Sequence, residues 1–91
     1  MLFRSRVTGE CMAPAIEPGD VVIFDSSPRE PQNGELVILT VEGEGVIVKR
    51  YHVVAGQRVL RSADGQEIRP HEARLEGIVL KIVKTATREP L

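Results

Sequence analysis

The chain has 91 residues, of which 42% are hydrophobic, 27% charged and only 3% aromatic, with a formal net charge of −1. This length suits one domain spanning residues 1–91, and the near-neutral charge argues against a surface that contacts nucleic acid. A single cysteine forms no internal disulfide, and no apolar run approaches about 18 residues, so we expect neither an oxidising compartment nor a membrane partner.

Residues typical of β-strands dominate the chain. Val, Ile and Leu recur in short runs bounded by Gly, Pro, Asn and Asp, which are turn-forming residues. The pattern predicts a mainly β domain with one short helical turn at residues 12–16 and a flexible tail at residues 85–91. We expect strands at residues 1–7, 20–25, 35–41, 45–51, 58–62, 67–69 and 75–84.

The segment around the cysteine carries several features of a reactive site. Gly9 lets the backbone approach a ligand closely, and Pro14 stiffens the chain just after Cys11. A side chain presented from a rigid, bent segment suits nucleophilic catalysis. A small buried thiol beside a loop is the other interpretation, because free cysteine is often simply buried.

Lys49 is the second candidate. In a strand over residues 45–51, alternation places Ile47, Lys49 and Tyr51 on one face. Partial loss of hydration between two large neighbours favours the neutral amine, which can act as a general base. A lysine that extends its amine into solvent is the alternative.

The order of these motifs resembles the peptidase domains of the LexA repressor, the UmuD mutagenesis protein and bacterial signal peptidases. Segments similar to the family's later strands follow at residues 33–37, 46–51, 60–70 and 75–79, so the resemblance covers nearly the whole chain. It implies a small, curled antiparallel β domain. The residues that match the motif around the family's nucleophile are Val7, Gly9, Met12, Pro14, Ile16, Gly19 and Asp20.

The resemblance also implies roles for individual residues. Cys11 stands where the family has its nucleophilic serine, and Lys49 matches the catalytic lysine. The backbone amides of Glu10 and Cys11 would form the oxyanion hole, with Gly9, Met12 and Pro14 supporting the substrate site. A peptide or protein would be the substrate, no cofactor or metal is implied, and a cytoplasmic location and a part in the SOS response follow from the LexA-like members.

Cysteine changes the chemistry of such a dyad. A thiol has an unperturbed pKa near 8.5 and an amine one near 10.4, so in water the proton prefers the amine by roughly 2.6 kcal/mol. Burial opposes the resulting ion pair because both charges lose hydration. Cys11 and Lys49 therefore rest either as thiolate and ammonium or as neutral thiol and amine, and both states stay open.

Two functions follow from these observations. One is a peptidase, although residues 1–10 lack the Ala-Gly or Cys-Gly bond at which LexA-like proteins cut themselves. The other is an inactive relative that serves in dimerisation or partner binding. For either, we expect a homodimer through residues 75–83, with Ile78, Leu80 and Ile82 on one face of a strand and Val79, Lys81 and Val83 on the other.

Other sites have weaker support in the sequence. His52, His71 and Cys11 have no spacing typical of a metal site, so no metal is expected. The acidic turn at residues 42–45 has the character of a solvated hairpin loop.

Overall fold

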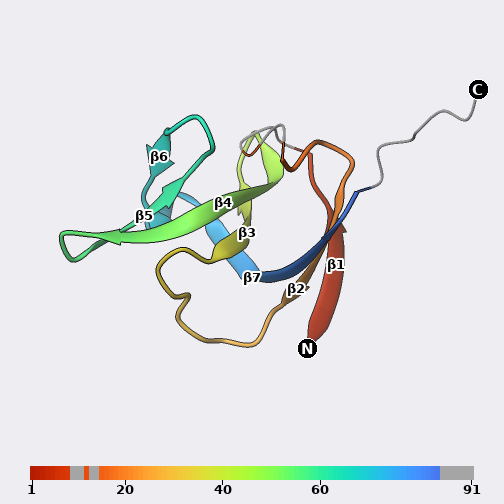
Figure 1. The fold of residues 1–91 in the computed structure, drawn as a ribbon, viewed down its shortest axis with the longest axis horizontal. Coiled ribbons are helices and arrows are strands. Elements are labelled where there is room, and N and C mark those ends of the chain that lie inside the picture. The colour runs from red at the N-terminus through yellow and green to blue at the C-terminus, as the bar shows by residue number, and fades with distance from the viewer. Residues whose placement is uncertain (9–11, 13–14, 85–91) are drawn as a thin grey trace, which may run out of the picture.

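The computed structural model describes residues 1–8, 12 and 15–84. They form one seven-stranded antiparallel sheet with strand order β1-β2-β7-β3-β4-β5-β6 (Figure 1). The strands are β1 (Leu2–Arg6), β2 (Val21–Asp25), β3 (Leu36–Val41), β4 (Gly45–Val54), β5 (Gln57–Arg61), β6 (Glu67–Ile68) and β7 (Arg74–Val83), and a short 3-10 helix, η1 (Pro70–Glu72), precedes β7. None of the described residues belongs to a helix long and apolar enough to cross a membrane.

The mainly β prediction is confirmed, and each predicted strand has its counterpart. The clearest difference is β4, which runs to Val54 instead of ending at residue 51. It is longer because Ala55 and Gly56, with φ of 51° and 79°, form a two-residue turn directly into β5. The resulting hairpin projects from one end of the molecule (Figure 1). The predicted tail at 85–91 lies outside the described residues.

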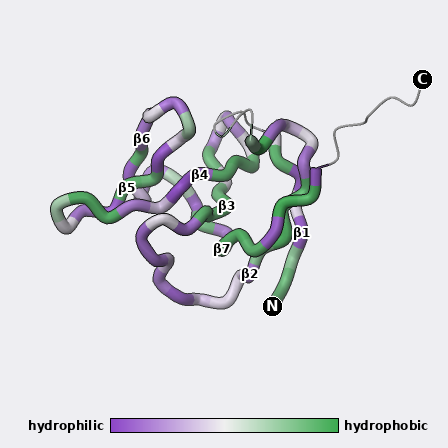
Figure 2. Tube along the Cα trace, viewed as in Figure 1, coloured by the Kyte–Doolittle hydropathy of each residue, from purple (hydrophilic) through white to green (hydrophobic). Residues whose placement is uncertain are grey.

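The sheet has a hydrophobic core on each face. The first core contains Val7, Met12, Ile16, Val22, Phe24, Ile38 and Val48. The second core contains Val37, Leu39, Ile47, Tyr51, Leu60 and Ile78. Neighbouring residues of β3 and β4 alternate between the two, as the period of a strand requires. Figure 2 shows the resulting hydrophobic runs along the central strands and a hydrophilic loop between β2 and β3.

The curl of the sheet brings the end of β1 against the start of β4. The Thr8 amide donates to the Val46 carbonyl at 2.8 Å, and the Val46 amide donates to Thr8 Oγ1 at 2.9 Å. Gly45 permits this approach, because a Cβ there would lie 2.5 Å from Thr8 Oγ1. The first core is therefore enclosed between β1 and β4 at this end of the sheet.

The prediction that Ile82 shares a face of β7 with Ile78 and Leu80 is wrong. The pairing of β2 with β7 shifts by one residue between Ile23 and Phe24. Ile23 pairs with Lys81 and Phe24 pairs with Val79, so Leu80 is an extra residue in β7. This bulge turns Ile82 to the same side as Val79, and both pack against the first core. Leu80 is instead exposed, as is Val83 to a lesser extent.

The polar loop at residues 26–35 is held by hydrogen bonds between its own residues and by hydrogen bonds to β4. Glu35 accepts two hydrogen bonds from the Arg29 guanidinium, at 3.1 and 3.0 Å, and one from the Gln32 amide at 2.7 Å. These contacts, the Arg29 pair foremost, lower the pKa of Glu35. Nearby, Tyr51 donates to Glu30 at 2.5 Å, and burial together with this bond raises the pKa of the phenol.

The lowered pKa of Glu35 predicts a loss of stability in acid. A carboxyl with a folded pKa below its unfolded value stabilises the fold above the unfolded pKa, which is about 4.3 for a glutamate. That contribution is lost as the pH falls through the folded pKa. We expect Glu35→Gln to reduce the fall in melting temperature between pH 7 and pH 3. Glu42→Gln, at an exposed residue without a polar contact among the described residues, is the control and should melt like the original protein. An unchanged acid dependence in Glu35→Gln would contradict the prediction.

Candidate active site

Lys49 is a buried cationic side chain in β4. It is 4% exposed and lies opposite Val37 of β3, on the face that carries the second core. Its neighbours on this face of β4 are Ile47 and Tyr51, which are also buried. The expected placement between these residues is confirmed, and the alternative of a lysine extended into solvent is wrong.

Ser62 is a polar partner of the Lys49 amine. Lys49 Nζ donates a hydrogen bond to Ser62 Oγ, and Ser62 is itself 6% exposed. The serine directly follows β5, where its amide donates to the Gln66 carbonyl at 2.8 Å and so closes the turn into β6. A buried polar group next to an amine supplies an acceptor that water would otherwise provide.

The sequence reasoning missed Ser62. Its position could have been found by register, because Arg50 pairs with Arg61 and the next pair outward would join residues 49 and 62. The pairing of β4 with β5 was not among the predictions, so the serine was assigned only to a hairpin.

Lys49 lies in β4 between two points of contact with other parts of the chain. Val46 is bonded to Thr8, and pairing with β5 starts at Arg50. Thr8 is therefore held three residues along β4 from Lys49, and Cys11 follows three residues later in the chain.

The described residues on either side of Cys11 are both anchored. Before it, Thr8 is bonded to Val46. After it, Met12 belongs to the first core together with Val48, and the Met12 carbonyl accepts a hydrogen bond from the Ile16 amide at 3.0 Å. This bond has the spacing of a helical turn, and the turn expected at residues 12–16 stays a prediction because residues 13 and 14 lie outside the described residues.

A model of the family described as Peptidase S24-like matches residues 1–81. The chain belongs to the Peptidase S24-like family. This confirms the resemblance to LexA- and UmuD-like peptidase domains over nearly the whole chain. A search of curated proteins found no match.

Most of the site predicted for this Peptidase S24-like domain lies at residues that the structure does not describe. Cys11, Gly9, Glu10 and Pro14 are outside the described residues, so their predicted roles stay predictions. Among the predicted site residues, Lys49 and Met12 are described, and both are buried.

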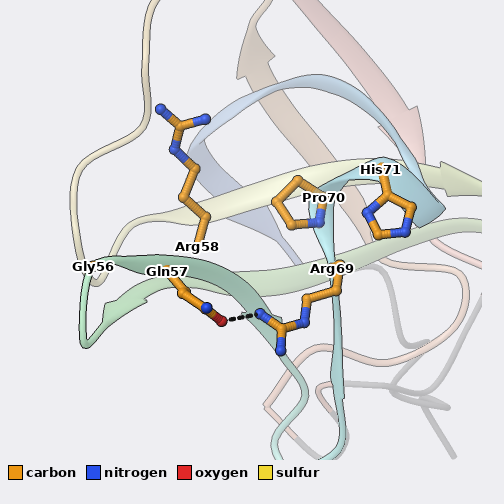
Figure 3. Close-up of a pocket in the computed structure, with 6 residues that line it drawn as sticks. All are labelled: Gly56, Gln57, Arg58, Arg69, Pro70 and His71. Carbon is orange, nitrogen blue, oxygen red and sulfur yellow. Dashed lines mark hydrogen bonds between the residues drawn. The ribbon is translucent and has the colours of Figure 1, made fainter.

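A separate open cavity of about 650 Å³ lies beside η1 in the Peptidase S24-like domain. It is lined by Gly56, Gln57, Arg58, Arg69, Pro70 and His71. The two guanidinium groups point apart, as Figure 3 shows: Arg69 turns to the Gln57 side chain, to which it donates at 2.7 Å, and Arg58 pairs with Glu30 at 2.9 Å. The cavity thus offers no convergent set of charges, and no group of metal-binding side chains occurs among the described residues.

Proposed function

We propose that this Peptidase S24-like domain hydrolyses a peptide bond in a peptide or protein substrate through a Cys11–Lys49 dyad, in the manner of the LexA- and UmuD-like members. The observation that carries the proposal is the burial of Lys49, whose amine donates a hydrogen bond to Ser62. A buried amine with a polar partner on an otherwise apolar face is an arrangement that general acid–base chemistry requires.

The length of chain between Thr8 and Cys11 supports the proposal that Cys11 lies next to Lys49. A strand rises about 3.3–3.4 Å per residue, so Lys49 lies roughly 10 Å along β4 from Val46. Cys11 is three residues beyond Thr8, which is bonded to Val46, and three residues span at most about 10–11 Å. The segment that carries the cysteine is therefore long enough to reach the amine.

The proposed reaction has two steps. The Cys11 thiolate attacks the substrate carbonyl carbon, the backbone amides of Glu10 and Cys11 stabilise the oxyanion, and a carbon–sulfur bond forms. As the carbon–nitrogen bond breaks, the Lys49 ammonium gives its proton to the leaving amine. Water then attacks the thioester while the neutral Lys49 amine accepts its proton. The carbon–sulfur bond breaks, the carboxylic acid is released, and the Cys11 thiolate and the Lys49 ammonium are restored.

An inactive domain that binds a partner is the second candidate, because a thiol is bulkier than the serine hydroxyl that the family uses. The expected homodimer through residues 75–83 stays a prediction that suits both candidates, and sedimentation over a range of protein concentrations tests it. The exposed apolar side chains that β7 offers to a partner copy are Leu75, Leu80 and Val83.

Thiol alkylation at Cys11 against pH tests the proposed dyad. The thiolate is the reactive form, and a neighbouring ammonium stabilises it, so Cys11 should react faster than the thiol of a short peptide at every pH below 8. The measurement is the rate of iodoacetamide labelling followed by mass spectrometry. A Cys11 that reacts no faster than the peptide would remove the dyad and favour the inactive candidate.

A further inference from the structure

Lys84 ties the end of β7 to the turn that follows the cysteine segment. Its amine donates to the Ala15 carbonyl at 2.9 Å, forms a hydrogen-bonded ion pair with the Asp20 carboxylate, and lies 3.7 Å from a carboxylate oxygen of Glu17. One side chain thus contacts three residues of a single turn that lies far away in the sequence.

Asp20 is the centre of this turn. It is 1% exposed, and its carboxylate also accepts a hydrogen bond from the Glu17 amide at 2.9 Å. A buried carboxylate is costly unless it is paired and hydrogen-bonded, so the Lys84 contact favours the conformation in which Asp20 lies inside.

The same turn holds the chain on both sides of Cys11. On the N-terminal side, the Val7 amide donates to the Asp20 carbonyl at 2.9 Å, and the Gly19 amide donates to the Val7 carbonyl at 2.7 Å. On the C-terminal side, Ile16 is bonded to the Met12 carbonyl, and both side chains are buried in the first core.

We propose that Lys84 is a positioning residue for Cys11, a role that rests on the proposed peptidase function. By fixing Asp20 inside the turn, Lys84 fixes both attachment points of the segment that presents the thiol to Lys49. Without it, the turn loosens, the thiolate loses the stabilisation of the Lys49 ammonium, and a smaller fraction of Cys11 is reactive at neutral pH.

The test is the pH profile of Cys11 alkylation in Lys84→Met, Lys84→Arg and Lys81→Met. In Lys84→Met, a rise of one pH unit in the midpoint would lower the rate at pH 7 about three- to eightfold for a starting midpoint of about 6.5 to 7.5, since the rate follows the thiolate fraction. Lys84→Arg keeps the cation and should restore most of the rate. Lys81→Met removes an exposed lysine of β7 that has no polar contact among the described residues, and should react like the original protein.

The outcomes separate this inference from the proposed function. A folded Lys84→Met protein with an unchanged profile overturns the positioning role and leaves the dyad standing. A Cys11 that is inert in the original protein removes the dyad, and the positioning role with it. If Lys84→Met does not fold, Lys84→Gln, which keeps a hydrogen-bond donor but no charge, decides: a raised midpoint supports the role, and an unchanged one overturns it.

Discussion

Replacing Lys49 by methionine is expected to abolish the excess reactivity of Cys11 while leaving the domain folded. The thiolate then has no neighbouring ammonium, so the alkylation rate below pH 8 should fall to that of a free thiol peptide. If the dyad lowers the thiol midpoint by one to two pH units, the fall at pH 7 is roughly ten- to thirtyfold. Labelling rates measured across pH on the two proteins check this.

The stability of Lys49→Met separates a functional lysine from a structural one. Methionine has a similar length and places an apolar chain among Ile47, Tyr51 and the rest of the second core. Replacing a buried charge by a well-packed apolar group is often neutral or stabilising, and the Ser62 hydroxyl loses a bond worth about 1 kcal/mol. We therefore expect a change in unfolding free energy within roughly 1 kcal/mol, measured by urea denaturation.

Lys49→Ala is the matched variant for this measurement. It removes the amine as well but leaves a cavity in the second core, so it should lose reactivity equally and lose more stability. Full reactivity of Cys11 in a folded Lys49→Met protein would contradict the dyad.

The sequence was sufficient to place the strands and the face of Lys49. Both depend on local chemistry: β-branched runs bounded by turn residues, and the period of two along a strand. The end of β4 is the exception, because the two-residue turn at Ala55 and Gly56 extends the strand beyond the predicted residue 51. The face on which Lys49 lies could be predicted because side chains alternate along β4 without interruption from Ile47 to Tyr51.

The errors concern relations between strands. The bulge at Leu80 arises in the pairing of β7 with β2, and no pattern within residues 75–83 predicts it. Ser62 was missed for a similar reason, since its contact with Lys49 depends on the register of β4 against β5. Lys84 lies 64 residues from Asp20, and no local pattern links them.

Strand β3 lies between the two cores and contributes side chains to both. In an antiparallel sheet with one solvated face, alternate residues of a strand would be polar. In β3, however, Val37, Ile38 and Leu39 are all 0% exposed, because the curled sheet has a hydrophobic core on each face. A continuous apolar run thus marks the strand that both cores share.

This arrangement predicts that two adjacent residues of β3 are equally important although they point in opposite directions. Ile38→Ala removes atoms from the first core and Leu39→Ala from the second, and each should lower the unfolding free energy by about 2–5 kcal/mol. Leu2→Ala, at an exposed apolar side chain of β1 outside the expected dimer strand, is the control and should cost no more than about 0.5 kcal/mol. Urea denaturation of the three proteins measures these differences. A small loss of unfolding free energy in either β3 variant would mean that its face of the sheet carries no core. For Leu39→Ala, this result would also contradict the apolar surroundings assigned to Lys49.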